Sequence, residues 1–131
     1  MPRPPQELHE KMAIGSERDK TNKALGKAGE NKACAYLKKC GYKILERNYK
    51  SPVGEVDVIA QKGEVLAFIE VKTRLSDSYG IPSEAVNFKR RQKYLNAAKY
   101  YFYGRPIDCT VRFDIIEIYR GEVNHIKNAF Y

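Results

Sequence analysis

Hydrophobic and polar positions alternate with two different periods along the chain. Between residues 22 and 40, apolar and small side chains recur at helical spacing and Gly41 follows as a natural stop, so we predict a helix there. A second helical pattern covers residues 83–103, with Ser83 as the expected N-cap and Gly104 after the last turn. Alternating and β-branched stretches predict strands at 42–49, 55–61, 64–74, 110–119 and 123–126.

The order of these elements predicts the fold class. Short turns join the first three strands, whereas a helix separates the third strand from the fourth and makes a crossover connection. We therefore predict an α/β protein in which helices flank a mixed β-sheet, in the order α-β-β-β-α-β with a short final strand. Residues 1–21 show no periodicity and are expected to be a disordered tail or leader, which leaves residues 22–131 as a single domain.

Composition limits the compartment and the class of partner. No apolar run approaches the roughly 20 residues that cross a bilayer, and the N-terminus lacks a signal-peptide core, so we expect a cytoplasmic protein with no membrane partner. Three cysteines without a C-x-x-C pair support neither a disulfide framework nor a zinc site. A net charge of +8 makes nucleic acid the leading partner class.

Positive charge is concentrated around the second predicted helix. From Glu84 to Arg105 a single acid accompanies six cations. These cations are Lys89, Arg90, Arg91, Lys93, Lys99 and Arg105. As a cluster they favour a surface that faces phosphate, although for any one of them a solvated helix face remains the alternative. The aromatic stretch "YYFYGR", residues 100–105, has two interpretations as well: stacking platforms for unpaired bases, or core packing at the end of an amphipathic helix.

Charged side chains interrupt strands that otherwise carry core residues. Glu70 and Lys72 share one face of the strand 64–74, because successive strand residues point to opposite faces. If Lys62 and Gly63 are the two turn residues, Asp57 faces Phe68 and lies diagonal to Glu70 on that same face.

The assignment of the turn decides this grouping. With the two-residue turn, Glu55 lies opposite Glu70, and Asp57, Glu70 and Lys72 project together. A three-residue loop would place Asp57 on the other face.

Such a set of residues suits metal-dependent hydrolysis of a phosphodiester. Clustered carboxylates repel each other, and a hard cation such as Mg²⁺ or Mn²⁺ removes that penalty by accepting their oxygens. The metal polarises the phosphodiester, and a nearby lysine orients water or stabilises developing charge. The alternative for each residue taken singly is an edge-strand charge or a salt bridge, for instance between Glu70 and Lys72 or Arg74.

Ordered sequence blocks also carry a resemblance to a known family. Asp57 followed by Glu70-Val71-Lys72 on the next strand resembles the PD-(D/E)xK, or restriction-endonuclease-like, superfamily, with Val56 in place of its proline. The blocks "GKAGENKACAYLKKCGYKILERN", "GEVDVIA", "FIEVKTR", "YGIPSEAVNFKRRQK" and "RFDIIEI" resemble the YraN family of small bacterial proteins, which is related to archaeal Holliday junction resolvases. The resemblance spans residues 26–118.

The resemblance implies roles for particular residues. It implies that Asp57 and Glu70 bind the metal, that Lys72 is the catalytic lysine, and that Glu30 is an additional carboxylate of the site; an exposed helical charge is the alternative for Glu30. Glu55 belongs to the "GE-x-D" block, and it is expected to orient the metal ligands without binding the metal itself. The residues expected to contact nucleic acid are Lys89, Arg90, Lys93 and Arg74.

Two functions follow from these residues. The first is a metal-dependent endonuclease that hydrolyses DNA, with branched or processed DNA structures as expected substrates and Mg²⁺ or Mn²⁺ as cofactor. The second is a non-catalytic nucleic-acid-binding or assembly module that keeps the nuclease fold. The resemblance to resolvases further implies a homodimer, because symmetric cutting of two strands needs two sites.

Overall fold

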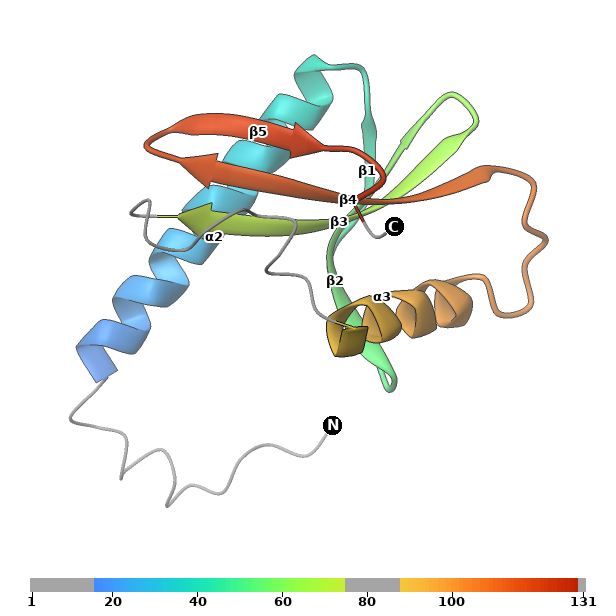
Figure 1. The fold of residues 1–131 in the computed structure, drawn as a ribbon, viewed down its shortest axis with the longest axis horizontal. Coiled ribbons are helices and arrows are strands. Elements are labelled where there is room, and N and C mark those ends of the chain that lie inside the picture. Colours follow the sequence, from blue (N-terminus) through green and yellow to red (C-terminus); the bar gives the residue numbers. More distant parts are fainter. Residues whose placement is uncertain (1–15, 75–87, 130–131) are drawn as a thin grey trace.

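The computed structural model describes residues 16–74 and 88–129, with side chains described for residues 25–74, 89 and 91–129. Two helices and five strands follow each other in the predicted order (Figure 1). They are α2 (Ser16–Lys39), β1 (Lys43–Ser51), β2 (Gly54–Lys62), β3 (Val65–Arg74), α3 (Phe88–Tyr101), β4 (Thr110–Tyr119) and β5 (Glu122–Ile126). Neither described helix is long and apolar enough to cross a membrane.

The five strands form one mixed sheet in the order β1-β2-β3-β4-β5. β3 is the middle strand: it runs antiparallel to β2 and parallel to β4. The parallel pairing extends over the full length of both strands, from Val65 beside Thr110 to Arg74 beside Tyr119. This confirms the predicted mixed sheet, because the connection that contains α3 is the crossover that a parallel pair requires.

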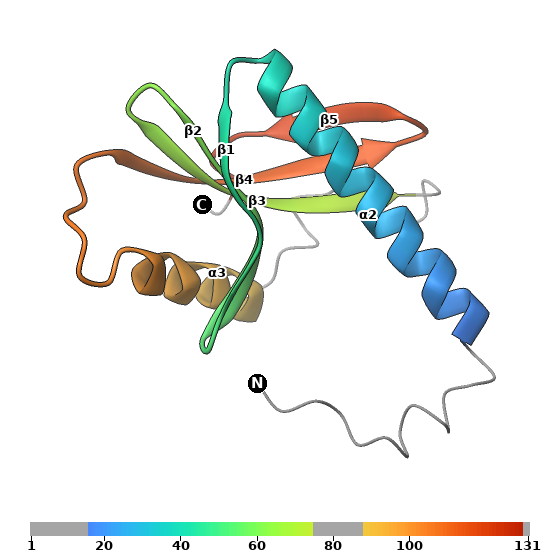
Figure 2. The same ribbon diagram turned by 180° about the vertical axis from the view of Figure 1, so that it is seen from behind.

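The two helices cover opposite faces of the sheet and define two cores (Figures 1 and 2). Leu37 and Ala33 of α2 lie in one core, to which β3 contributes Ile69. Tyr94 and Ala97 of α3 pack against the other, together with Leu66, Phe68, Val56, Ile59 and Phe113. Neighbouring residues of β3 therefore enter different cores, as the alternation of a doubly covered strand requires.

The structure corrects the start of the first helix and the turn between β2 and β3, and it leaves the start of the second helix untested. α2 begins at Ser16 rather than at residue 22, so its first turns extend into the segment assigned to the tail. α3 is described from Phe88, and the predicted N-cap Ser83 lies outside the described residues. The hairpin between β2 and β3 turns at Gly63 and Glu64, not at Lys62 and Gly63, because Lys62 still pairs with Val65.

Candidate functional site

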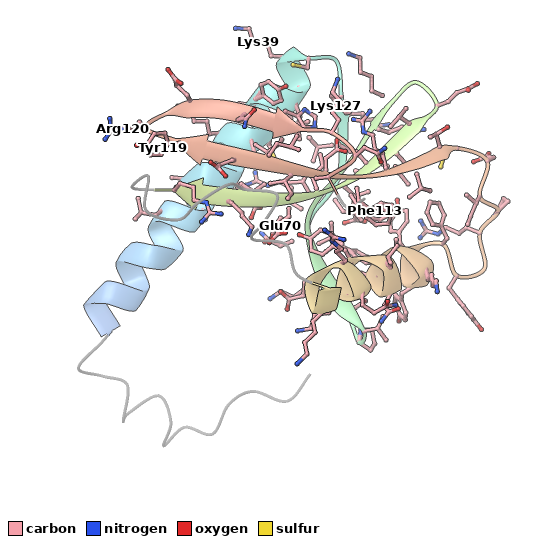
Figure 3. The ribbon with its side chains drawn as sticks, in the orientation of Figure 1. Lys39, Glu70, Phe113, Tyr119, Arg120 and Lys127 are labelled. Carbon is pink, nitrogen blue, oxygen red and sulfur yellow. The ribbon has the colours of Figure 1, made fainter. Side chains whose placement is uncertain are left out.

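Glu70 is a buried carboxylate in the middle strand of the sheet. Glu70 is 2% exposed (Figure 3). It lies two positions after Phe68, on the face of β3 that α3 covers. β3 is the middle strand of the sheet, but its described pairing with β2 ends at Ile69, so Glu70 and Lys72 pair with β4 alone. Burying a charged carboxylate costs free energy unless hydrogen bonds or an opposite charge compensate for it. The groups around Glu70 are therefore the ones to consider as a functional site.

Asp57 lies beside Glu70 where the pairing of β2 and β3 ends. The described ladder stops at Val58 and Ile69, and one further step in the same register brings Asp57 level with Glu70. The predicted pairing with Phe68 is therefore wrong by two residues, because Phe68 pairs with Ile59. A two-residue shift keeps each side chain on its face, so the grouping of Asp57 with Glu70 survives.

The side chain of Asp57 replaces a strand partner at this point. Its Oδ2 accepts a hydrogen bond of 2.9 Å from the backbone N–H of Val71. β2 also rotates here: Val58 packs in the α2 core and Val56 in the α3 core, although residues two apart on a regular strand share a face. Asp57 sits in the middle of this rotation and lines a hollow on each side of the sheet.

The first hollow, which we call the carboxylate hollow, lies between the sheet and α3. It measures about 510 Å³ and combines acidic groups with one cation, Lys93. Its lining residues are Ser51, Pro52, Val53, Gly54, Glu55, Asp57, Glu70, Lys93 and Tyr94. In the observed β2–β3 register the exposed Glu55 lies level with Lys72, beyond the end of the ladder, so its predicted position opposite Glu70 is wrong. Glu55 still lines the same hollow as Asp57 and Glu70.

The second hollow, the helix hollow, lies on the α2 side and measures about 600 Å³. Glu30 of α2 enters it and is 8% exposed, so its interpretation as an exposed helical charge is wrong. Its Oε1 accepts hydrogen bonds from Arg47 Nε at 3.2 Å and from Asn48 Nδ2 at 2.9 Å. Asp57 lines this hollow too, so Glu30 and Glu70 approach Asp57 from opposite faces.

The donor set of the carboxylate hollow fits a hard cation. Mg²⁺ is typically bound through one or two carboxylates, with water and substrate oxygens completing the coordination. Asp57 and Glu70 supply two carboxylates at one wall, without the sulfur or imidazole ligands that softer metals prefer. Within the described part of the chain, no three His, Cys, Asp or Glu side chains are grouped to enclose a metal by themselves.

The remaining predicted site residues are divided by the structure. Lys72 is half-buried on the same face as Glu70, but it does not line either hollow in the described structure. Arg74 is largely buried and lies 3.5 Å from Glu117 on β4, which favours a structural role over contact with nucleic acid. Lys89 and Lys93 are exposed on α3, and the side chain of Arg90 lies outside the described residues.

A comparison with known protein families identifies the family of this chain. The model described as "Uncharacterised protein family UPF0102" matches residues 29–118. The chain belongs to the UPF0102 family. This is the YraN family, so the resemblance carried by the sequence blocks is confirmed.

Curated members of UPF0102 align over most of their length. A UPF0102 protein of Thermodesulfovibrio yellowstonii is 47% identical over 107 residues, which cover 82% of this chain and 96% of the relative. One of Alkaliphilus metalliredigens is 43% identical over 113 residues, covering 83% and 99%. One of Clostridium acetobutylicum is 45% identical over 116 residues, covering 83% and 95%. Their names state the family and no activity.

The sequence analysis did not single out two residues of the candidate site, Arg47 and Asn48. Both line the helix hollow and hold Glu30. A signal was available at Asn48, because asparagine is depleted in strands and enriched among residues with positive φ. Asn48 has a φ of 51° within β1 and, in the β1–β2 register, lies level with Asp57.

Proposed function

We propose that this protein is a Mg²⁺- or Mn²⁺-dependent endonuclease that hydrolyses DNA phosphodiester bonds, with branched or processed DNA structures as its substrates. The observation that carries the proposal is the shared wall formed by Asp57 and Glu70 in the carboxylate hollow. Two neighbouring carboxylates, one of them buried, repel each other unless a cation neutralises them. The lysines on the exposed side of α3 add attraction for a phosphate backbone.

Each residue has a defined task in this proposal. Asp57 and Glu70 hold the metal ion, and when bound such an ion polarises the phosphodiester and lowers the pKa of its water. Val71 fixes the Asp57 carboxylate through its backbone N–H, so that this ligand needs no rearrangement. Lys72 orients the attacking water or stabilises negative charge on the phosphate, and Lys93 attracts the phosphate to the hollow.

The test is cleavage of a small DNA panel: supercoiled plasmid, single strand, flap and four-way junction, with Mg²⁺ or Mn²⁺. The native protein should cleave at least one substrate, and Glu70→Gln, which keeps the side-chain volume, should cleave none. Glu64→Gln is the matched control, because Glu64 is an exposed acid in the β2–β3 turn and carries the same charge change. Equal cleavage by the native protein and Glu70→Gln would overturn the proposal.

A non-catalytic nucleic-acid-binding or assembly module is the second candidate. Two observations favour it: the absence of a three-ligand group among the described residues, and the position of Lys72 outside the lining of both hollows. This candidate predicts DNA binding that EDTA does not change and no cleavage with any divalent metal. Salt dependence does not separate the two candidates, because both contact phosphate.

A further inference from the structure

The aromatic residues at the end of α3 divide into a partly buried pair that packs against the core and an exposed pair. The rings of Tyr101 and Phe102 have centroids 5.8 and 6.0 Å from that of Phe68, so they belong to the α3 core. Tyr100 and Tyr103, in contrast, are 48% and 87% exposed. Core packing therefore accounts for Tyr101 and Phe102, but it does not account for the exposed rings of Tyr100 and Tyr103.

The exposed pair continues a stripe that starts at the carboxylate hollow. Helical spacing places Lys89, Lys93, Asn96 and Tyr100 on one side of α3, at intervals of four, three and four residues. Tyr103 follows three residues later in the turn that ends the helix. Lys93 also lines the carboxylate hollow, and seven residues of helix put Tyr100 about 10 Å further along the axis. The stripe thus joins the acidic wall to two exposed rings.

Charge along this stripe favours a polyanion. The α3 sequence from Phe88 to Tyr101 has no acidic residue. Lys89 and Lys93 are exposed on the stripe, and Lys99 is exposed elsewhere on the helix. Cations beside exposed aromatic rings are the combination that binds a single strand, because the cations attract phosphates while the rings stack on base faces.

We propose that Tyr100 and Tyr103 form a stacking platform for unpaired DNA bases, and that Lys93 leads the same strand into the carboxylate hollow. The platform would help to select the DNA that the proposed endonuclease cleaves. Its link to the carboxylate hollow rests on that proposed function. Paired bases are stacked within the duplex and cannot offer their faces, so the platform selects DNA that has an unpaired segment.

Binding measured in EDTA tests the platform without any need for cleavage. The probes are a fluorescently labelled oligothymidylate and a blunt-ended duplex, followed by fluorescence anisotropy. Tyr103→Ala should weaken oligothymidylate binding about fivefold or more, and the double variant with Tyr100→Ala should weaken it further. Duplex affinity should stay unchanged, and Tyr103→Phe should bind like the native protein, because the ring is kept. Ile107→Ala, which truncates a 63%-exposed side chain in the following loop, is the control.

The platform would be overturned if the native protein did not bind oligothymidylate, or if the double variant bound it normally. It would also be overturned if the variants lost equal affinity for oligothymidylate and for the duplex, or if Tyr103→Phe bound oligothymidylate as weakly as Tyr103→Ala. These results are separable from failure of the endonuclease proposal. Cleavage that depends on Glu70, combined with normal oligothymidylate binding by the double variant, would overturn the platform alone. Selective loss of oligothymidylate binding in a protein that cleaves nothing would overturn the endonuclease and retain the platform.

Discussion

The side-chain amide of Asn48 donates a hydrogen bond of 2.9 Å to Glu30 Oε1, although Asn48 has a left-handed φ of 51° within a β-strand. This conformation costs an L-residue about 1–2 kcal/mol and persists where the surroundings compensate for it. Arg47 donates to the same Glu30 oxygen, and all three side chains line the helix hollow with Asp57. Asn48 therefore holds the Glu30 carboxylate at the hollow that Asp57 also lines.

Replacing Asn48 by glycine separates this positioning from stability. Glycine adopts positive φ without strain, so the free energy of unfolding of Asn48→Gly should equal or exceed that of the native protein. DNA cleavage should fall about tenfold, because Glu30 loses one of its two donors. Urea denaturation and initial cleavage rates check the two effects. Native cleavage by Asn48→Gly would show that the amide has no part in the reaction, and Asn48→Ala, which keeps the strain, should be destabilised by about 1 kcal/mol.

Asp57 makes a structural hydrogen bond and has a proposed role as a metal ligand, and two substitutions distinguish these roles. Asp57→Asn retains an acceptor for the backbone N–H of Val71, so it should fold with nearly native stability while losing the charge that binds Mn²⁺. Asp57→Ala loses the acceptor as well and should be destabilised by about 1–2 kcal/mol, because that N–H lies within the sheet. Isothermal titration with Mn²⁺ and thermal unfolding measure the two properties. Native Mn²⁺ affinity in both variants would remove Asp57 as a ligand.

A separate buried carboxylate, Asp114 on β4, is held by several hydrogen-bond donors. It is fully buried, as are few acids in proteins. Arg112 Nε lies 2.9 Å from its Oδ1, His125 Nε2 lies 2.7 Å from its Oδ2, and the backbone N–H of Asn128 donates to it at 2.9 Å. Burial alone would raise the pKa of Asp114, but the bonds from His125, Arg112 and Asn128 together hold it below its ordinary value.

The lowered pKa fixes the sign of the pH dependence. The unfolded chain takes up the proton at a higher pH than the folded protein, so the stabilisation is complete above about pH 4 and is lost as pH falls through the folded-state pKa. Asp114→Asn should flatten this acid dependence and lower stability at pH 7 by about 3 kcal/mol, because Arg112 keeps its charge without the counter-charge. Urea unfolding at a series of pH values tests this. Glu122→Gln, at an exposed position of β5, should leave the native profile unchanged.

Gly54 allows α3 to approach the start of β2 and thereby closes the carboxylate hollow. A Cβ at this position would lie 2.5 Å from the backbone carbonyl oxygen of Lys93, and backbone cannot give way as a side chain does. Gly54→Ala should therefore lower the free energy of unfolding by about 1–3 kcal/mol and weaken Mn²⁺ binding. Gly26→Ala in α2 is the matched control: its Cβ meets open space, and removal of a helical glycine should raise stability by about 1 kcal/mol. Equal stability of the two variants would contradict the close approach.

Local pattern was sufficient for the elements and the approximate grouping of the site. Alternation along 64–74 placed Glu70 and Lys72 on the face of Phe68, and this face proved to be the one covered by α3. The register was less well determined, since a turn at Lys62 and Gly63 and one at Gly63 and Glu64 are both two residues long. Because a two-residue shift preserves the face, the grouping of Asp57 with Glu70 survived the wrong turn.

The sequence by itself determined the order of helices and strands, the mixed sheet and the family, because these depend on periodicity and on short ordered blocks of residues. Only the tertiary structure decided which groups meet. The rotation of β2 at Asp57, the left-handed Asn48 and the approach of Glu30 from α2 all arise from packing between segments distant in the chain. Packing also divided the aromatic stretch into a partly buried pair and an exposed pair, since helical spacing fixes the angle between side chains but not the face that the sheet covers.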